Sequence, residues 1–510
     1  ATIKKYPIGQ MPAGLFLANK PPGYDVAKAY FAGFITRNGS TWIGPGPYNF
    51  PFHNDYRGQP NRSDPQNYTA ANATEAAKIS KTAINWANDY PSDIQQSTLL
   101  GIEYLENPVR RSALNCEAKL STLQFIYYIQ HDLGEPNWSV ANDEGFGQGF
   151  TTGCANIPAE FKTVEKYFPP IPYIREGRRG IGMYTLTSAD QKRVPPATGL
   201  PAKIFSSAIA IGAYDSDLHG CFTDDTLETI DGRRETTADF HTGGVFQIPF
   251  ESLIPETIDG VIFAEKNISQ SRMSNGATRL QPSTMLIGQA GGAIAAIANQ
   301  RNILPRQVRP IWVQKELLKA KSMLSVYDFT DVPMTHPRWA SVQMVSLYKI
   351  MIGKGGGVFG VNDNLNRGQM AAVISRIFKL DTDPAHYPTP TFTDVPRTHL
   401  FYGSIEAIYR AGITGGCSSS PRKFCPEALT TRAQFAVFLR RGLGLDLSTA
   451  GPGSVYSDVP LSHSFRADIN VMFQKGLLVD CAPTKFCPNV AITRGDTAAF
   501  LEKVLLYQAN

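Results

Sequence analysis

The sequence lacks any long apolar run and any long run of one charge. No apolar stretch approaches the roughly 20 residues that a membrane-spanning helix needs, so we predict no transmembrane segment. The formal net charge is only +5, without an extended basic run, which argues against nucleic acid as a partner. The first residues, ATIKKYPIG, contain no apolar core of a signal peptide, which fits either a cytosolic protein or a processed chain.

Charged residues are sparse, at 18% of the chain, whereas hydrophobic residues make up 42%. This composition is typical of a globular protein with well-formed cores. The length of 510 residues predicts two to four domains.

Cysteine is scarce as well, and four of the seven cysteines form two close pairs. Cys417 with Cys425, and Cys481 with Cys487, each close a short loop that ends in Phe-Cys-Pro. Both pairs lack the CxxC spacing and nearby histidine of a zinc site, so we predict two disulfides, no metal and an oxidising, extracytoplasmic setting. The other cysteines are Cys116, Cys154 and Cys221. They could form one disulfide plus a free thiol, or remain three buried thiols.

The last third of the sequence repeats itself three times. An aromatic residue followed by Thr or Ser and then Asp-Val-Pro occurs at Phe329, Phe392 and Tyr456, and 63 or 64 residues separate successive openings. In each unit the opening predicts a turn into a first helix, and a turn and a loop lead on to a second helix.

The second helix of each unit has a start signal followed by an arginine. The signals are NRGQ at 366–369, TRAQ at 431–434 and TRGD at 493–496, which fit a capping box. The arginines are Arg367, Arg432 and Arg494. Since a cation in the first turn opposes the helix dipole, its repetition indicates a function such as gripping an acidic group. The alternative is that these arginines form salt bridges within the repeats.

The openings, the Gly-Ile-Thr-Gly-Gly turn at 412–416 and the Thr-Arg-Ala-Gln motif make this region similar to three tandem S-layer homology (SLH) modules. We place the modules at 326–388, 389–452 and 453–510. The resemblance implies a pseudo-threefold helical domain at the cell surface that binds cell-wall polysaccharide, often acidic or pyruvylated, in grooves between repeats. Arg432 and Arg494 match the motif best. Arg367 lies in a looser match, and its repeat lacks the Cys loop, so we expect its groove to differ or to be silent.

The first 325 residues begin with irregular chain rich in Tyr, Pro, Asn and Gly. We predict helices over 71–106 and 117–133, and a strand buried on both faces at 260–264. A helix over 283–298 has one nearly bare face, because small residues recur at helical spacing. The small residues are Gly288, Gly291, Gly292 and Ala295. The bare face predicts that something packs closely against this helix.

Five segments resemble the C-terminal part of FAD-dependent oxidoreductases of the glutathione-reductase-like superfamily. They are IPYIREGRRGIGMYTLTSAD, YDSDLHG, GGVFQIPFESLIP, VIFAEKNIS and GATRLQPSTMLIGQAGGAIAA, in that order. The resemblance covers roughly 1–322 and implies FAD and hydride transfer from an organic substrate to the flavin. In that family the final helix abuts the flavin and its ribityl chain, which would account for the bare face.

The resemblance places the candidate site residues. Expected flavin contacts are Gly288, Gln289, Ala290 and Gly291 on the helix, with Asn267, Ser269, Arg279 and Gln281 on its approach. Arg279 could instead be a surface cation. His219 is the candidate acid/base because histidine titrates in the useful range, and a structural histidine is the alternative. Arg175, Arg178 and Arg179 could bind an anionic substrate or the FAD phosphates, or form salt bridges with Glu176 and its neighbours.

The strand–GxGxxG–helix unit that cradles the FAD pyrophosphate in this superfamily is missing. The nearest stretch, GFGQGFTTG at 145–153, has the wrong spacing. The FAD-binding half could lie on a second polypeptide, the chain could be a truncated piece, or the protein could be a degenerate enzyme that has lost its cofactor. We favour a second polypeptide as partner, since a lone fragment would expose the bare helix face.

The sequence therefore predicts a multidomain protein. An α/β (α+β) flavoprotein-like part at 1–325, without its N-terminal GxGxxG unit, precedes an all-α pseudo-threefold SLH domain. The predicted function is a secreted, wall-anchored subunit of an FAD-dependent oxidoreductase. The alternative is a non-enzymatic surface-layer protein on a relic oxidoreductase fold.

Overall fold

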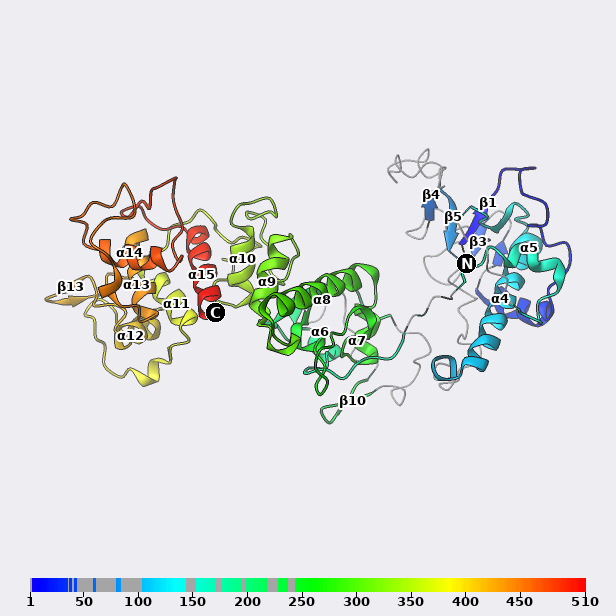
Figure 1. The fold of residues 1–510 in the computed structure, drawn as a ribbon, viewed down its shortest axis with the longest axis horizontal. Helices are drawn as coiled ribbons and strands as arrows, with labels where there is room; N and C mark the ends of the chain where they lie inside the picture. Colours follow the sequence, from blue (N-terminus) through cyan, green and yellow to red (C-terminus); the bar gives the residue numbers. More distant parts are fainter. Residues whose placement is uncertain are drawn as a thin grey trace. The chain divides into compact units, whose positions relative to one another are not determined.

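The computed structural model describes most of the chain, in two compact units (Figure 1). The described residues are 2–34, 36–38, 41–43, 58–60, 79–83, 103–143, 153–170, 172, 174, 176–194, 199–217, 228–236 and 244–510. The first unit spans Ala1–Gly177, and the second comprises Arg178–Asp217 and Thr223–Asn510. A multidomain protein is thus confirmed. The boundary predicted at residue 325 lies within the second unit and stays a prediction.

The first unit is built on a small antiparallel sheet with the strand order β4-β5-β1-β6. Its strands are β1 Thr2–Lys5, β4 Gly58–Pro60, β5 Ile79–Ala83 and β6 Trp138–Val140, and β2 Thr36–Asn38 and β3 Thr41–Ile43 form a separate hairpin. Its helices are α1 Tyr24–Phe34, α4 Pro108–His131, η2 Ala159–Phe161 and α5 Lys162–Glu165. Helix α4 packs against α1 and β6 and buries Leu123, Phe125 and Ile126 in the core of this unit.

The helix predicted over 71–106 is wrong at 79–83, where β5 pairs with β1 and β4. β5 carries Lys81, whose side chain is 1% exposed and whose ammonium lies 2.9 Å from the carboxylate of Asp143. Pairing with two neighbouring strands overrides the weak local helix preference of this stretch. The helix predicted over 117–133 is confirmed, because it is the larger part of α4.

The second unit begins with a part in which one long helix, α8, covers a two-stranded sheet (Figure 1). Its strands are β7 Arg193–Val194, β8 Leu200–Pro201, β9 Ala208–Gly212, β10 Thr229–Ile230, β11 Arg233–Arg234 and β12 Phe246–Pro249. Its helices are α6 Ser188–Gln191, η5 Phe250–Ser252, η6 Glu265–Asn267, α7 Arg272–Thr278, α8 Gln281–Arg301, η7 Pro305–Gln307 and α9 Pro310–Lys319. Helix α8 packs on β9 and α9 and buries Ile287, Ala290 and Ile294.

The buried strand predicted at 260–264 is wrong. These residues form irregular chain, and Val261 is 44% exposed. A short apolar run cannot by itself distinguish a strand from irregular chain whose side chains pack one by one. Ile262 and Ala264 lie near α8, where a Cβ built on Gly291 would stand 3.7 Å from each.

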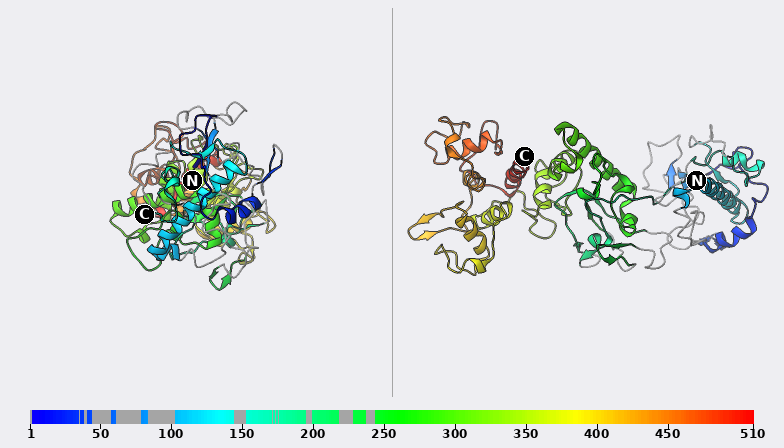
Figure 2. Two further views of the ribbon diagram at one scale, coloured as in Figure 1. Left: turned by 90° about the vertical axis from the view of Figure 1, so that its right-hand side faces the viewer. Right: turned by 60° about the horizontal axis from the view of Figure 1, so that its bottom comes forward.

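The repeat region consists of three helix pairs that close on themselves (Figures 1 and 2). The first helices of the repeats are α10 Trp339–Leu347, α12 Tyr402–Arg410 and α14 Arg466–Gln474. The second helices are α11 Arg367–Ile377, α13 Arg432–Gly442 and α15 Arg494–Gln508, and short turns η8 Pro384–His386 and η9 Leu447–Thr449 follow α11 and α13. Helix α12 packs on α11, α14 on α13, and α10 on α15. Each first helix thus packs on the second helix of another repeat.

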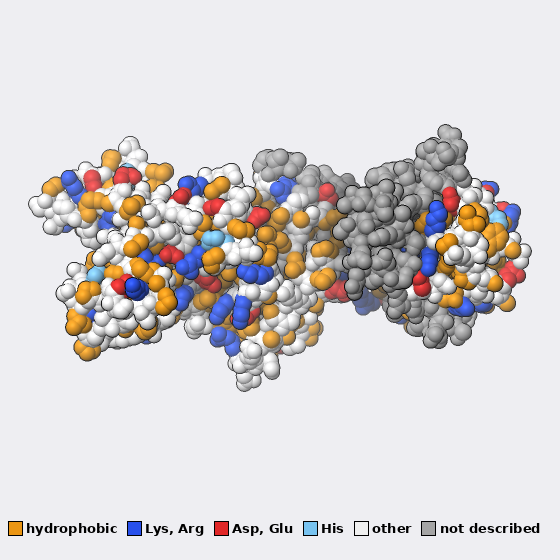
Figure 3. All heavy atoms as spheres, turned by 90° about the horizontal axis from the view of Figure 1, so that it is seen from above, with side chains coloured by type: hydrophobic (Ala, Val, Ile, Leu, Met, Phe, Trp, Pro, Cys, Tyr) orange, Lys and Arg blue, Asp and Glu red, His pale blue; other side chains and the backbone are white. Residues whose placement is uncertain are grey.

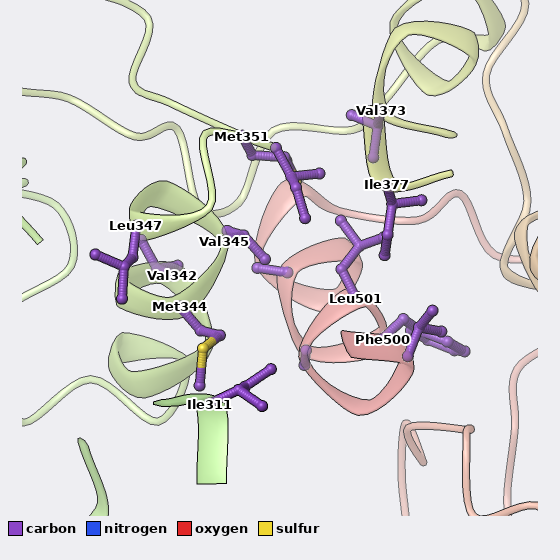
Figure 4. Packing of buried hydrophobic residues seen from close by; sticks show 14 of the residues in the cluster. Ile311, Val342, Met344, Val345, Leu347, Met351, Val373, Ile377, Phe500 and Leu501 are labelled. Atoms are coloured by element: carbon purple, nitrogen blue, oxygen red, sulfur yellow. The ribbon is translucent and has the colours of Figure 1, made fainter. Parts of the chain in front are cut away.

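Apolar side chains fill the space where the first and third repeats meet. In Figure 4, Val345 of α10 points toward α15, and Leu501 of α15 lies near Ile377 of α11. Val345 and Leu501 are fully buried, and Ile377 is 5% exposed. The third repeat therefore completes the core that the first repeat begins.

Each aspartate of the Asp-Val-Pro openings fixes the loop that follows in its own repeat. The carboxylate oxygens accept hydrogen bonds from backbone N–H groups, with N···O distances of 2.7–3.0 Å. The donors are Phe359, Gly360 and Val361 for Asp331, Phe424 and Cys425 for Asp394, and Phe486 and Cys487 for Asp458. Burial acts to raise the pKa of Asp331 and Asp458, but these N–H groups outweigh it and hold each pKa below its ordinary value.

The repeat region is helical but not all-α, which corrects the prediction. β13 Ser418–Ser419 and β14 Arg422–Lys423 form a hairpin that projects from the second repeat (Figures 1 and 2). The Cys loop of that repeat is long enough to turn back on itself, so its two arms pair.

Both predicted disulfides are present, between Cys417 and Cys425 and between Cys481 and Cys487. A third joins Cys116 of α4 to Cys154 in the first unit. Cys221 lies outside the described residues.

Basic, acidic and apolar side chains of the described residues are interspersed on the face that Figure 3 shows. None of the described helices is both long enough and apolar enough to cross a membrane.

Candidate functional site

The three arginines that follow the helix caps share one geometry. The Nε of each donates to a phenylalanine carbonyl oxygen of another repeat at 2.8 Å, and each guanidinium lies 4.7–5.3 Å from the centre of the same phenylalanine ring. The pairs are Arg367 with Phe424, Arg432 with Phe486, and Arg494 with Phe359. Burial lowers the pKa of all three guanidinium groups, yet arginine stays charged at neutral pH. The arginines therefore join the repeats as well as carrying charge into the interfaces.

The remaining nitrogens of the three arginines have different surroundings. Nη2 of Arg494 donates to the carbonyl oxygen of Ile352 at 2.9 Å. Arg432 donates to the carbonyl oxygen of Val479 and to the carboxylate of Asp496. Arg367 is 5% exposed, and its Nη2 is buried without a hydrogen-bond partner among the described residues.

Arg367 lies in a groove of about 380 Å³ between the repeats. The lining residues are Arg367, Thr414, Gly415, Gly416, Cys417, Ser418, Ser419, Gln434, Val437, Phe438, Arg441 and Phe465. This set includes two guanidinium groups, several hydroxyl groups and two aromatic rings, but no carboxylate. Such a set suits a polar ligand with negative charge.

The looser motif around Arg367 leads us to expect a groove that differs from the others or is silent. It does differ, because Arg367 has a nitrogen without a partner among the described residues. The sequence reasoning also missed Arg441 and Gln434, which lie on the next helix of the groove. The available signal was register: Val437, Phe438 and Arg441 follow Gln434 by three, four and seven residues, which places all four on one face of α13.

The bare face of α8 is open in the described part of the chain. Gly288 and Gly292 are exposed, and a Cβ built on either would meet no described atom within 4 Å. Met285 of the same helix is 73% exposed. Ala290 and Gly291 instead lie on the packed face, and the side chain of Gln289 accepts a hydrogen bond from Ser322 at 2.8 Å.

Helix α8 begins at Gln281, so its free N–H groups belong to its first turn. Gly288 to Gly291 lie about two turns further on, where the backbone N–H groups are used within the helix. A flat ring could therefore approach this stretch by van der Waals contact, while the positive end of the helix dipole lies near Gln281.

The predicted residues on the approach to α8 lie along the chain from η6, through α7, to the first residue of α8. The side chain of Asn267 donates to the carbonyl oxygen of Arg178 at 2.5 Å, and the hydroxyl of Ser269 is buried 2.9 Å from that of Thr185. Arg279 is 4% exposed and donates to the carboxylate of Asp217 at 2.8 Å, so it is not a surface cation. Gln281 is exposed at the start of α8.

The other predicted catalytic and cationic residues are only partly described. His219 and Arg175 lie outside the described residues. Arg179 forms an ion pair with Glu228, which fits the salt-bridge interpretation of this cluster, although with a more distant partner than Glu176.

The described residues fit only one side of a flavin. The open face of α8 could take a flat ring, but every pair of named strands in the described chain is antiparallel, so no parallel βαβ unit is present there to cradle a pyrophosphate. The glycine-rich stretch at 145–152 lies outside the described residues. We therefore derive no catalytic step through FAD.

Similarity to known proteins agrees with this architecture. Residues 328–371 and 391–436 match the S-layer homology domain. The chain is 29% identical over 152 residues to "Cell surface protein" of Thermoanaerobacter kivui, covering 29% of this chain and 20% of that protein. It is 26% identical over 176 residues to "S-layer protein EA1" of Bacillus anthracis, covering 34% of this chain and 20% of that protein. The chain thus spans about a fifth of the length of these curated relatives.

The SLH domains and the S-layer relatives indicate a protein of the cell surface. Ahead of the SLH domains, residues 35–317 match the family described as FAD dependent oxidoreductase. Because this match covers more than half of the 510 residues, the chain belongs to the FAD dependent oxidoreductase family.

Proposed function

We propose that the chain is held at the cell surface by an acidic cell-wall polysaccharide that binds in the groove at Arg367. The observation that carries this proposal is the buried, unpartnered Nη2 of Arg367 in a groove that contains a second arginine and no carboxylate. A buried donor without a partner costs free energy, and a side-chain shift that uncovers Nη2 would let a carboxylate of the ligand supply the missing acceptor. Arg494 remains a candidate contact in its own interface, whereas Arg432 is already bound to Asp496.

The uncharged side chains that line the groove also suit a sugar. Phe438 and Phe465 offer rings against which a sugar face can pack, and Ser418 and Ser419 offer hydroxyl groups to its hydroxyls. The ligand is therefore an acidic saccharide rather than a free inorganic anion.

Calorimetric titration of the full chain with an acidic cell-wall polysaccharide tests this proposal. The exposed Arg441 is the variant to use first, since Arg441→Ala leaves the Arg367–Phe424 contact in place. Loss of one charge-assisted hydrogen bond should weaken binding about tenfold. Arg367→Gln should weaken it further, with the thermal unfolding curve recorded to check the fold. Lys475→Ala removes an exposed cation outside the groove and is the matched control.

Two results would contradict the proposal. One is unchanged binding after the polysaccharide carboxyl groups are reduced to alcohols. The other is an Arg441→Ala variant that binds as tightly as the unaltered chain.

We further propose that the anchored chain is one subunit of an FAD-dependent oxidoreductase, with the GxGxxG half on a second polypeptide that covers the bare face of α8. The observation that favours a partner is the exposure of Met285, Gly288 and Gly292 along one side of that helix. The reaction class implied by the family is hydride transfer from an organic substrate. His219 would act as acid/base in that reaction, and Asn267, Ser269, Arg279 and Gln281 would line the approach.

The visible spectrum of the protein isolated from its native source tests the second proposal. A flavin absorbance band and a co-purifying polypeptide are expected. Met285→Arg should abolish co-purification, whereas Glu316→Arg, an equivalent change at an exposed position of α9, should not. A colourless single chain would favour the alternative, a non-enzymatic surface-layer protein on a relic oxidoreductase fold.

A further inference from the structure

Asp496 occupies the position in the third repeat that glutamine occupies in the other two. Gln369, Gln434 and Asp496 are each the third residue of the second helix of their repeat. The side chains of Gln369 and Gln434 accept the N-cap backbone N–H at 3.2 and 3.0 Å and so complete a capping box. The carboxylate of Asp496 instead turns to arginines of two other repeats.

The two arginines are Arg432 and Arg338. Arg338 donates to Asp496 at 2.7 Å, and Arg432 donates to the other oxygen of the same carboxylate. Arg432 is only 1% exposed, whereas the side chain of Asp496 is 23% exposed, so water reaches the ion pair from the aspartate side only. One carboxylate thus joins guanidinium groups from the first and second repeats.

Arg338 is itself a departure from the repeat pattern. It is the N-cap of α10, where α12 has Phe401 and α14 has Phe465. Phe465 lines the groove at Arg367. The interface at Arg432 therefore differs from that groove in two corresponding places, with Asp496 for Gln434 and Arg338 for Phe465.

We propose that Asp496 is a built-in substitute for an acidic ligand, and that it closes the Arg432 interface to cell-wall polysaccharide. This inference rests on the proposed function of the groove at Arg367. A ligand at Arg432 would have to displace a carboxylate that belongs to the same chain and is already in place, which gives Asp496 the advantage of a tethered competitor.

The same comparison specifies the chemistry of the ligand at Arg367. Asp496 places its carboxylate against Nη1 of Arg432, while Nε and Nη2 of that arginine donate to the carbonyl oxygens of Phe486 and Val479. In the groove at Arg367, Nε is used in the same way and no carboxylate lines the groove. The position that Asp496 fills at Arg432 is therefore left for a carboxylate of the ligand at Arg367.

Two exchange variants test the inference. Asp496→Gln copies the residue of the other repeats and should open the Arg432 interface, and Gln434→Asp should close the groove at Arg367. The full chain is titrated calorimetrically with size-defined fragments of an acidic cell-wall polysaccharide. Asp496→Gln should raise the number of binding sites by one, and Gln434→Asp should weaken binding at Arg367 at least tenfold. Glu316→Gln, an exposed charge removal on α9, is the control, and melting curves check that each variant folds.

The outcomes separate this inference from the proposed function. Binding by the unaltered chain, with no additional site in Asp496→Gln and no loss in Gln434→Asp, would overturn the role of Asp496 and leave the groove at Arg367 in place. Binding only by Asp496→Gln would support the role of Asp496 and overturn the proposed function of Arg367. Absence of binding by every variant would overturn both.

Discussion

The helices of the repeat region are covered by helices of other repeats, whereas one face of α8 is left open in the described chain. In the repeats, each first helix packs on the second helix of another repeat, and the arginines and aspartates bind backbone groups across or within repeats. Helix α8 buries one face on β9 and leaves Gly288 and Gly292 open in the described chain. A repeated sequence can supply its own packing partners, whereas a single helix with a bare face depends on something outside the described residues.

The largest loss of stability should come from removing a buried side chain at an interface between the repeats. Phe486 is fully buried beneath the guanidinium of Arg432, so Phe486→Ala should cost about 3–5 kcal/mol of the stability of the repeat region. Leu461, at 69% exposure, is the matched position, and Leu461→Ala should change stability by less than about 0.5 kcal/mol. Urea unfolding followed by circular dichroism measures both. Equal effects at the two positions would show that the repeats are not joined through Phe486.

Removing a disulfide should have the next largest effect. Replacing both Cys481 and Cys487 by alanine frees a loop of only a few residues and should cost about 2 kcal/mol. The first repeat reaches a similar fold without cysteine, so the variant should still fold. Urea midpoints in oxidising buffer test this expectation, and a midpoint equal to that of the unaltered chain would contradict it.

Acid should weaken the repeat region through Asp331 and Asp458. Their pKa values are lower in the folded than in the unfolded chain, so their stabilising contribution is complete above about pH 4 and is lost as the pH falls through the folded-state pKa. Asp331→Asn should cost about 1.5 kcal/mol at pH 7, because it removes charge-assisted hydrogen bonds. The cost should shrink as the pH falls below 4. Melting temperatures between pH 2 and 7 check this, and a pH-independent difference would exclude the ionised carboxylate as the cause.

The smallest effect should occur on the open face of α8. Gly288→Ala should stabilise the chain by about 0.5–1 kcal/mol, since alanine is the better helix former and its Cβ meets no described atom within 4 Å. Gly368→Ala should destabilise it, because the new Cβ would stand 2.6 Å from the ring of Phe401. Thermal unfolding compares the two variants. Destabilisation by Gly288→Ala would mean that the chain itself covers this face.

The sequence predicted the repeat region well because the same signals recur three times. The capping boxes at Asn366 and Thr431 and both Cys loops are where the motifs place them. It did not reveal which arginine lies in an open groove. The contact of Arg432 with Asp496 could not be read from the motifs, and Asp496 also binds Arg338, which lies 158 positions earlier in the sequence.

The oxidoreductase-family part was harder to predict, because each of its sequence motifs occurs only once. The bare helix could be recognised from glycine spacing, but the run at 260–264 looked like a strand and is irregular chain. Its side chains pack against α8 and Gly180 one by one, which leaves no periodic pattern to distinguish it from a strand.

The contact between Arg494 and Phe359 also constrains the order of folding. Its two residues are 135 positions apart, and α10 packs more extensively on α15 than on α9. The contacts of α10 with α15 can therefore form only after α15 has emerged from the ribosome, although α12 can pack on α11 earlier. The repeat region is thus completed late in synthesis, which suits a region that folds after export to the cell surface.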